Sequence, residues 1–520
     1  MHHAIEVDLI VVLRHKGHKD GEKMSTTWKV LEKHLEKSKA LEAALTLFSW
    51  DSETLAPKAS NENTSKFIGI LSAEQYHAIM NDEVRSLLVK LEEQENFEKL
   101  TNVQQKIIQK LREQFDELEK ISPEDYQDYC ELESRSYVIW EEAKEKSDFK
   151  IFEPTLKKVI EYRKKFAKAC AKPGESPYDY LLRQNEECFN QKFLDQFFEE
   201  LKETIVPLLK KAKEKEATIA KDYNTLYYDP LKQEKFCHFL AEYIGFDFER
   251  GVIAESAHPF TTNFHNKDVR ITNHFYDHNL ESAMFSVIHE GGHALYEMGI
   301  RDDISMTMLG TGTSMGMHES QSRLYENIIG RSKSFWKPIY PKLQETFKEQ
   351  LGEVSLETFV QGINKAMPSL VRTEADELSY TLHIIIRYEI EKELFADEIE
   401  VEDLPSIWNQ KYEEYLGVTP SNDAEGVLQD VHWAGGMFGY FPSYALGSAI
   451  AAQMMAHMKK IMPIDTYLEE GNLAAIREYL DEHVHQYGRL KNTNEILMDM
   501  MGEPLSAHYF TDYLKDKFEI

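Results

Sequence analysis

The sequence predicts a mainly α-helical protein with a small β-sheet edge, and three observations carry this prediction. From residue 27 to about residue 220, apolar side chains recur every three or four residues among Glu and Lys, the spacing of amphipathic helices. Residues 251–277 instead alternate apolar and polar side chains, as Val269, Ile271 and Phe275 show, which indicates short strands or a hairpin. Helical spacing then returns towards the C-terminus, with breaks at residues 417–426 and 435–447.

The first of these regions contains the longest expected helices, over residues 98–121, 123–147 and 193–217. Residues 1–23 lack this periodicity, so we expect a flexible N-terminal extension there, with the helical pattern opening at Met24. No linker rich in Gly, Ser or Pro divides the remainder. We therefore expect residues 24–520 to form a single domain.

The composition is that of an acidic globular protein. Among 520 residues, 60 are basic and 90 acidic, which gives a formal net charge of −30. This balance opposes nucleic acid and anionic membranes as partners, because both bind basic patches. The four cysteines are far apart and show no paired metal-ligand spacing, so we interpret them as free thiols in a reducing compartment. No stretch approaches the ~20 apolar residues of a membrane span, and we expect a cytoplasmic protein.

The pentapeptide His-Glu-Gly-Gly-His at residues 289–293 is the strongest candidate for a functional site. It lies in a segment expected to be one helix from Leu280 to Met298, with Asn279 as its N-cap. Residues i and i+4 of a helix share one face, so His289 and His293 can hold one metal ion between them. Glu290 stands beside the pair, where a carboxylate could take a proton from water at the metal.

Chance alone produces such a pentapeptide in roughly one chain in ten, so its context has to support it. An apolar stripe runs along the same helix beside the histidines, which places them at the wall of a cleft. Two glycines inside a helix cost about 1 kcal/mol each relative to Ala. We therefore expect another segment to approach closely at Gly291 and Gly292.

A catalytic zinc site needs a third protein ligand and one open position. Residues 306–317 form a glycine-punctuated loop or strand, after which residues 318–321 (His-Glu-Ser-Gln) open another helix. His318, Glu319 and Glu326 are the candidates for the third ligand. A solvated charged face is the ordinary alternative, but the loop is long enough to fold this helix back against the first.

Several further motifs occur in an order that resembles the carboxypeptidase Taq family of zinc metallocarboxypeptidases. Beyond the zinc helix and residues 318–321, they are residues 50–54 (WDSET), 258–260 (HPF), 268–272 (DVRIT), 371–376 (VRTEAD) and 426–433 (GVLQDVHW). The resemblance spans about residues 27–520. It departs from the family at Asn273, His274 and Tyr325, none of which is at a ligand position.

The resemblance implies a zinc site of His289, His293 and Glu319, with Glu290 as the general base. It implies one divalent metal ion per chain, and cobalt or manganese would also suit such a ligand set. The implied fold is an elongated, two-lobed helical body with a deep central groove, similar to angiotensin-converting enzyme and neurolysin. It also implies a homodimer that acts on peptides with a free C-terminus.

The remaining site residues are hypotheses on the chemistry that such a reaction needs. A tetrahedral oxyanion needs a donor besides the metal, for which we take Tyr440, with His432 as the alternative. The guanidinium fork of Arg270 or Arg372 suits the α-carboxylate of the substrate. A structural ion pair, with Asp268 or Asp376 respectively, is the alternative for each, and Asp376 could instead orient a metal-bound imidazole.

His258 is a candidate for lining the substrate strand, and the edge of the small sheet could bind an extended peptide by strand addition. Three functions follow. The first is a carboxypeptidase that releases single C-terminal residues, and the second is an oligopeptidase or dipeptidase of similar fold. The third is a helical binding module with an inert metal motif.

Overall fold

The computed structural model describes residues 3–215 and 219–518, and it describes side chains for residues 26–214 and 219–518. Helix α1 begins at His3, so the main chain of residues 3–23 forms the first part of this helix. The side chains of the predicted N-terminal extension lie outside the described residues. Its flexibility therefore stays a prediction.

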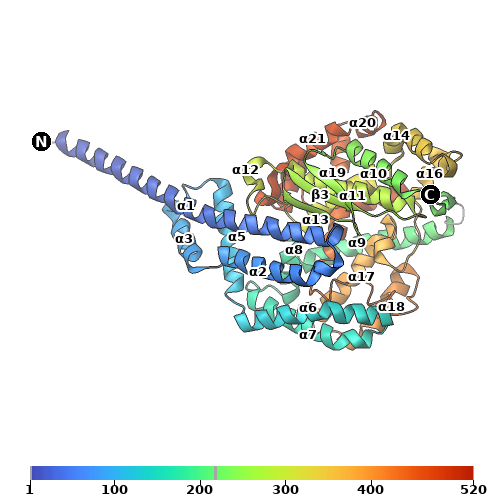
Figure 1. The fold of residues 1–520 in the computed structure, drawn as a ribbon, viewed down its shortest axis with the longest axis horizontal. Helices are drawn as coiled ribbons and strands as arrows, with labels where there is room; N and C mark the ends of the chain where they lie inside the picture. The colour runs from blue at the N-terminus through green and yellow to red at the C-terminus, as the bar shows by residue number, and fades with distance from the viewer. Residues whose placement is uncertain (1–2, 216–218, 519–520) are drawn as a thin grey trace.

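The chain is mainly helical, as predicted (Figure 1). The helices before the sheet are α1 (His3–Thr54), α2 (Asn61–Ile79), α3 (Asp82–Glu92), α4 (Gln94–Phe97), α5 (Asn102–Leu118), α6 (Pro123–Lys146), α7 (Phe149–Cys170), α8 (Pro177–Asn185), α9 (Gln191–Lys215) and α10 (Pro230–Ile244). The strands are β1 (Gly251–Glu255), β2 (Thr261–His265) and β3 (Asp268–Asn273).

The helices after the sheet carry the metal motif and most of the large core. They are α11 (Leu280–Gly299), α12 (Asp302–Ser305), α13 (Met315–Arg323), α14 (Lys333–Thr346), α15 (Lys348–Leu351), α16 (Leu356–Ile363), α17 (Glu377–Phe395), α18 (Leu404–Leu416), α19 (Pro442–Ile461), α20 (Ile464–Glu469), α21 (Leu473–His483), α22 (Thr493–Met501) and α23 (His508–Phe518). A π-helical turn, Leu324–Ile329, continues α13.

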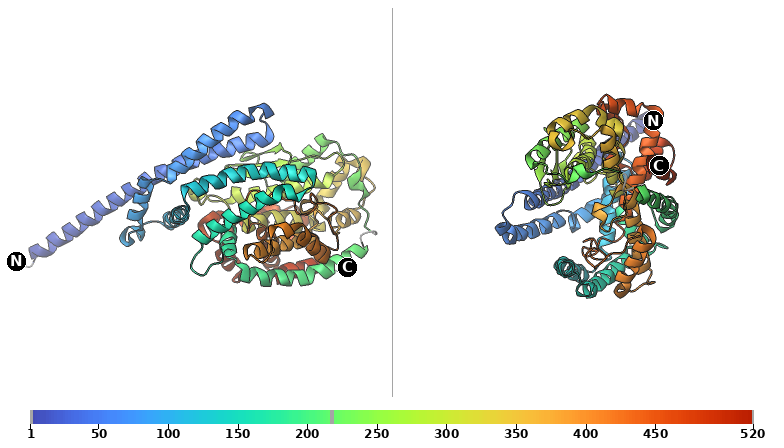
Figure 2. Two further views of the ribbon diagram at one scale, coloured as in Figure 1. Left: turned by 90° about the horizontal axis from the view of Figure 1, so that it is seen from below. Right: turned by 90° about the vertical axis from the view of Figure 1, so that its right-hand side faces the viewer.

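The long N-terminal helices agree with the predicted segments. Helix α5 lies within residues 98–121 and α6 within 123–147, whereas α9 begins at Gln191, two residues before the predicted segment 193–217. Their ends follow from local chemistry: Ser122 caps α6 ahead of Pro123, and Thr101 caps α5 in a reciprocal capping box with Gln104. Helices α1 and α2 pack side by side as a hairpin (Figure 2).

The predicted strands form one mixed three-stranded sheet in the order β1-β3-β2, so β2 is an edge strand. Strand β3 pairs with β1 in parallel and with β2 antiparallel, with Thr261 opposite Ile271. Val269 and Ile271 are fully buried. Strands β2 and β3 both pack against α11, which brings the sheet edge beside the metal motif.

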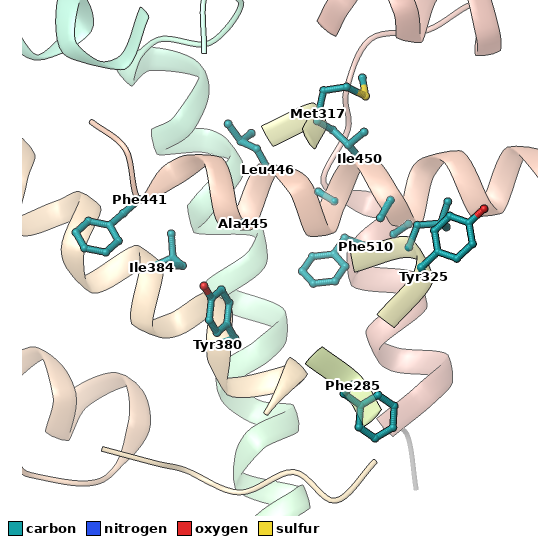
Figure 3. Packing of buried hydrophobic residues seen from close by; sticks show 14 of the residues in the cluster. Phe285, Met317, Tyr325, Tyr380, Ile384, Phe441, Ala445, Leu446, Ile450 and Phe510 are labelled. Carbon is teal, nitrogen blue, oxygen red and sulfur yellow. The ribbon is translucent and has the colours of Figure 1, made fainter. Parts of the chain in front are cut away.

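The large core is built around helices α11, α13, α17 and α19, whose apolar residues are almost wholly buried. Figure 3 shows Leu446 and Ile450 of α19 beside Met317 of α13, with Tyr380 of α17 nearby. A second, smaller core joins α1, α3 and α5 to the segment after α11, through residues such as Leu31 and Ile304. No helix among the described residues is both long and apolar enough to cross a membrane.

One predicted break is wrong in its extent. Residues 435–447 were expected to lie outside helices, but α19 begins at Pro442. Proline is well suited to the first turn of a helix, because its missing N–H would have no partner there. The small residues that follow pack closely against α13, so they belong to a helix interface instead of a loop.

Candidate functional site

Helix α11 presents its two histidines from a buried scaffold. Asn279 caps the helix by accepting a hydrogen bond from the Ser282 N–H, as predicted. The helix is buried over most of its length, but the side chains of His289 and His293 are partly accessible, with 20% and 15% of their surface exposed. Their rings lie 4.9 Å apart, one helical turn from each other.

Helix α13 supplies the acidic partner, and two glycines allow it to approach. A Cβ atom on Gly292 of α11 would lie 2.7 Å from the carbonyl oxygen of Gln321 in α13. A Cβ atom on Gly447 of α19 would lie 2.7 Å from both Cβ and Cγ of Glu319. Close approach at Gly291 and Gly292 was predicted, and Ile244 of α10 is the neighbour at Gly291.

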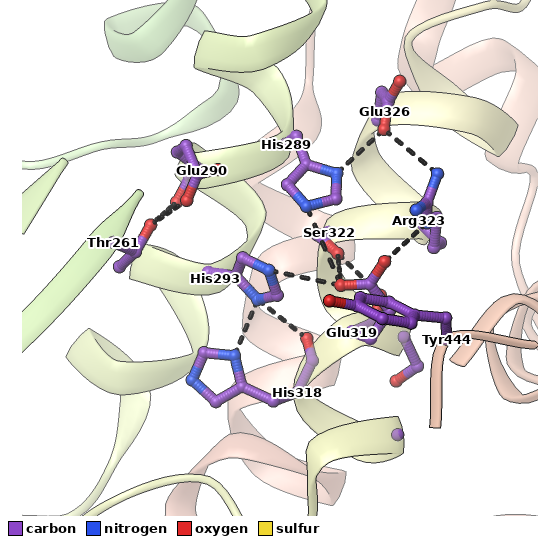
Figure 4. Close-up of polar contacts among 12 residues, drawn as sticks. Thr261, His289, Glu290, His293, His318, Glu319, Ser322, Arg323, Glu326 and Tyr444 are labelled. Carbon is purple, nitrogen blue, oxygen red and sulfur yellow. Dashed lines mark hydrogen bonds and ion pairs between the residues drawn. The ribbon is translucent and has the colours of Figure 1, made fainter. Parts of the chain in front are cut away.

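Three predicted ligands converge at this point (Figure 4). The Oε2 atom of Glu319 lies 3.4 Å from Nε2 of His293 and 3.7 Å from Nε2 of His289. Their donor atoms form the cluster of potential metal ligands found among the described residues. Donors about 2.0–2.2 Å from a tetrahedral zinc ion are about 3.4 Å from one another, so this set fits a metal ion.

The predicted role of Asp376 in orienting a metal-bound imidazole is wrong, because another carboxylate orients His289. Asp376 is the N-cap of α17 and accepts hydrogen bonds from the Leu378 and Ser379 N–H groups. Glu326 accepts instead from Nδ1 of His289, at 2.8 Å. Burial raises the pKa of Glu326, but the opposing effect of His289, Arg323 and Arg331 is larger and lowers the pKa to about 2. A carboxylate on Nδ1 leaves Nε2 of His289 free to bind a metal.

Arg323 occupies the second oxygen of Glu319. Its Nε donates to Oε1 of Glu319 at 2.7 Å, while its guanidinium stacks 4.4 Å from the ring of Tyr380. Burial raises the pKa of Glu319, but Arg323 and the two histidines hold it well below its usual range. Glu319 therefore offers Oε2 to a metal as an ionised ligand, with Oε1 already engaged.

Glu290 lies on the side of α11 that faces the sheet, and β2 contacts it directly. The hydroxyl of Thr261 is 2.6 Å from Oε2 of Glu290 and 3.0 Å from its carbonyl oxygen. Glu290 is 8% exposed, so its carboxylate has little contact with solvent. The contact places the edge strand β2 immediately beside the predicted general base.

His432 and Tyr440, the two candidate oxyanion donors, lie together. Their rings are 5.5 Å apart, and the ring of Tyr444 lies edge-on to that of Tyr440 at 5.4 Å. Burial, with help from Glu319, raises the pKa of Tyr440 to about 12, so its phenol keeps its proton. Burial and two arginines lower the pKa of His432 to about 4 against the opposing effect of Asp430, so its ring is neutral near pH 7. Nδ1 of His432 is buried without a hydrogen-bond partner.

Both candidate arginines are held by aspartates. Arg372 pairs with Asp430 at 2.8 Å, not with Asp376, and donates to Tyr380 at 2.9 Å. Arg270 pairs with Asp268 through Nε and Nη2, both at 2.8 Å, which is the structural ion pair predicted as the alternative to substrate binding. The Arg372 side chain is 7% exposed and that of Arg270 24%.

His258 lies in the turn before β2, with an exposed ring, and its carbonyl oxygen accepts from the Ser256 hydroxyl. Sequence reasoning missed Thr261 and Arg323 as neighbours of the site, and it considered Glu326 as a metal ligand and not as the partner of His289. Arg323 and Glu326 follow Glu319 by four and seven residues, and this helical spacing is the signal that relates them. Thr261 has no comparable signal, because its contact depends on how β2 packs on α11.

Gly447→Ala is expected to disturb the site from outside it. The new methyl group would overlap Glu319, and overpacking of this kind costs about 1–3 kcal/mol. We expect a lower melting temperature and a lower zinc content, measured by calorimetry and by elemental analysis. Gly69→Ala in α2 is the matched control: nothing lies within 4 Å of the added atom, so it should stabilise slightly. Equal behaviour of the two variants would contradict the packing argument.

Comparisons with known proteins assign the chain to a family. Residues 30–518 match the family described as Carboxypeptidase Taq (M32) metallopeptidase. Carboxypeptidase 1 of Bacillus subtilis is 44% identical over 476 residues, which cover 91% of this chain and 94% of that protein. An M32 carboxypeptidase from Deinococcus radiodurans superposes with a TM-score of 0.91 at 31% identity, covering 95% of this chain and 99% of that one.

Metallocarboxypeptidase 1 of Trypanosoma cruzi superposes with a TM-score of 0.90 at 32% identity, over 95% of this chain and 100% of that one. The likeness extends over nearly the whole length of each protein and includes the helices that bring His289, His293 and Glu319 together. The chain therefore belongs to the carboxypeptidase Taq (M32) family and is a metal-dependent carboxypeptidase.

Proposed function

We propose that this enzyme releases single amino acids from the C-termini of peptides, with Glu290 as the general base. The observation that carries the proposal is the convergence of Glu319 with His289 and His293, one residue from a carboxylate on the same helix. We take zinc as the ion, although cobalt or manganese would also suit two imidazoles and a carboxylate. When bound, the ion makes water acidic enough to react near neutral pH and polarises the peptide carbonyl.

Glu290 supplies the proton transfers in this proposal. Its carboxylate takes a proton from the attacking water and returns it to the departing amine. The Thr261 hydroxyl supports this role, because its hydrogen bond to Oε2 leaves Oε1 of Glu290 to receive the proton. His289 and His293 take no part in these proton transfers, since their Nδ1 atoms are already engaged in hydrogen bonds.

A phenol completes the stabilisation of the oxyanion. Tyr440 remains the proposed donor and His432 the alternative, and the position of Tyr444 beside Glu319 adds it as a second phenol (Figure 4). Loss of one oxyanion donor lowers kcat by about 10²–10³. Comparing Tyr440→Phe with Tyr444→Phe assigns the role, and an unchanged kcat in Tyr440→Phe would remove Tyr440.

Arg270 is the better placed of the two arginines to bind the substrate carboxylate. Asp268 engages Nε and Nη2 of Arg270. The side chain of Arg372 is more deeply buried, and it is bonded to Asp430 through Nε and to Tyr380 through Nη1. Arg270 lies on β3 opposite Thr262 of β2, the edge strand that could bind an extended peptide, and the exposed His258 lies just before that strand. Arg270→Lys should raise KM more than Arg372→Lys does, and the reverse order would favour Arg372.

Digestion of a peptide pool tests the reaction itself. Mass spectrometry should show a ladder of one-residue losses from free C-termini, which stops when the metal is removed by a chelator. Amidation of the same peptides should abolish the ladder, because no α-carboxylate remains to be bound. Internal cleavage that survives amidation would establish the oligopeptidase instead.

We also propose that the enzyme is a homodimer, as family resemblance implies, and that short or unfolded peptides are its substrates. The dimer is tested by light scattering of the purified enzyme across a concentration series. A mass of one chain at every concentration would contradict it.

A further inference from the structure

Glu297 is a buried carboxylate to which the proposed reaction gives no role. It lies on α11 one turn after His293 and is 2% exposed. Its Oε1 accepts hydrogen bonds from Thr311 at 2.8 Å, from the Gly312 N–H at 3.0 Å and from Nε2 of His318 at 2.8 Å. Its Oε2 accepts from the Asn263 amide at 2.5 Å. A carboxylate with this many donors is an organising centre, because an ion buried without them would be costly.

The proton positions follow from Glu297 outwards. A carboxylate only accepts, so His318 carries its hydrogen on Nε2, and a neutral imidazole then has a bare Nδ1. That Nδ1 is 2.6 Å from Nδ1 of His293, so His293 must be the donor. The carbonyl oxygen of His318, at 3.0 Å, is a second acceptor for the same hydrogen. Nε2 of His293 is thereby left with its lone pair, on the side of Glu319 (Figure 4).

We propose that Glu297 and His318 are positioning residues that hold His293 in the tautomer able to bind the metal ion. The inference rests on the proposed ligand set. In the opposite arrangement, a hydrogen on Nδ1 of His318 would require a bare Nδ1 on His293, whose Nε2 would then carry a hydrogen towards Glu319. The carboxylate of Glu297 disfavours that arrangement, because it needs the hydrogen on Nε2 of His318.

The same carboxylate joins three parts of the site. Asn263 belongs to β2, Thr311 and Gly312 to the loop ahead of α13, and His318 to α13 itself. Glu297 of α11 therefore holds the edge strand, the loop and α13 in fixed positions through hydrogen bonds. By contrast, His289 has a direct carboxylate partner in Glu326, so the two histidines are oriented by chains of different length.

Glu297→Gln tests the proposal with little change of shape. The Gln oxygen can occupy the place of Oε1, and Asn263 can turn its amide to accept from the new NH2 group, but a neutral amide holds the hydrogen on Nε2 of His318 less strongly than a carboxylate does. Glu281→Gln is the matched control: Glu281 lies on the same helix, is 7% exposed and accepts from Tyr223 at 3.1 Å, but does not contact this chain of histidines. Zinc dissociation constants are measured by competition with a chromogenic chelator, and unfolding of the metal-free proteins by calorimetry.

We expect Glu297→Gln to weaken zinc binding by about 10-fold, the lower end of the usual loss when an outer partner of a metal-binding His is removed, because the neutral amide still accepts from His318 but less strongly. Glu281→Gln should change it by less than twofold, with a similar melting temperature of the metal-free protein. Zinc affinity of Glu297→Gln within twofold of the wild type would overturn the inference. Failure of the wild type to bind zinc would overturn the proposed function instead, so the two failures are distinguishable.

A second pair of variants decides the matter if Glu297→Gln does not fold. His318→Asn keeps an amide oxygen near the position of Nδ1, whereas His318→Leu provides no acceptor there. We expect the Asn variant to bind zinc more tightly than the Leu variant. Equal losses in the two variants would show that the His318 side chain does not act through hydrogen bonding to His293.

Discussion

Glu290→Gln is expected to lower kcat by at least about 10³-fold while zinc stays bound, the upper part of the range for loss of a general base. The amide has nearly the shape of the carboxylate but cannot accept a proton from water. Zinc should be retained because the proposed ligands are His289, His293 and Glu319, and none of these changes. Initial rates on a free-acid peptide and elemental analysis of the same preparation measure both quantities.

Glu281→Gln serves as the control for this variant as well, since it removes a buried carboxylate from the same helix. It should keep nearly all activity. If Glu290→Gln were as active as the wild type, Glu290 would have no part in the reaction. A variant that lost zinc together with activity would instead place Glu290 among the ligands.

Substitution of a single ligand is expected to remove both metal and activity. His293→Ala and Glu319→Ala each leave two protein donors, fewer than the three that catalytic zinc sites use. We expect zinc content to fall from one ion per chain to near zero and kcat/KM to fall by about 10³-fold or more. His77→Ala, on the exposed surface of α2, should retain both.

Thermal unfolding provides an independent measurement of the same prediction. A ligand that binds only the folded protein stabilises it by about 4 kcal/mol at a thousandfold excess over its dissociation constant. A chelator should therefore lower the melting temperature of the wild type and leave that of His293→Ala unchanged. A chelator effect of equal size in both proteins would show that the stabilising metal is bound elsewhere.

The sequence was informative where periodicity relates residues within one element. His289 and His293 are four residues apart on a helix whose cap at Asn279 could be identified, and the paired glycines after Glu290 correctly indicated close packing. The alternation of residues 251–277 likewise predicted strands. These features depend on local chemistry, which the sequence contains directly.

Contacts between distant elements could not be read in the same way. The partner of Arg372 is Asp430, 58 residues away, although Asp376 was nearer in the sequence. His289 is oriented by Glu326 across 37 residues, and Glu290 meets Thr261 through the packing of β2 on α11. The assignment of Glu319 over Glu326 and His318 came from resemblance to a family, because all three lie on one stretch of helix.

The most direct test of the account is the position of the metal in a crystal of the zinc-loaded enzyme. Anomalous diffraction at the zinc edge should give one strong peak per chain, about 2.0–2.2 Å from Nε2 of His289, Nε2 of His293 and an oxygen of Glu319. A peak at any other group of side chains, with these three atoms uncoordinated, would contradict the proposed site and the mechanism that depends on it.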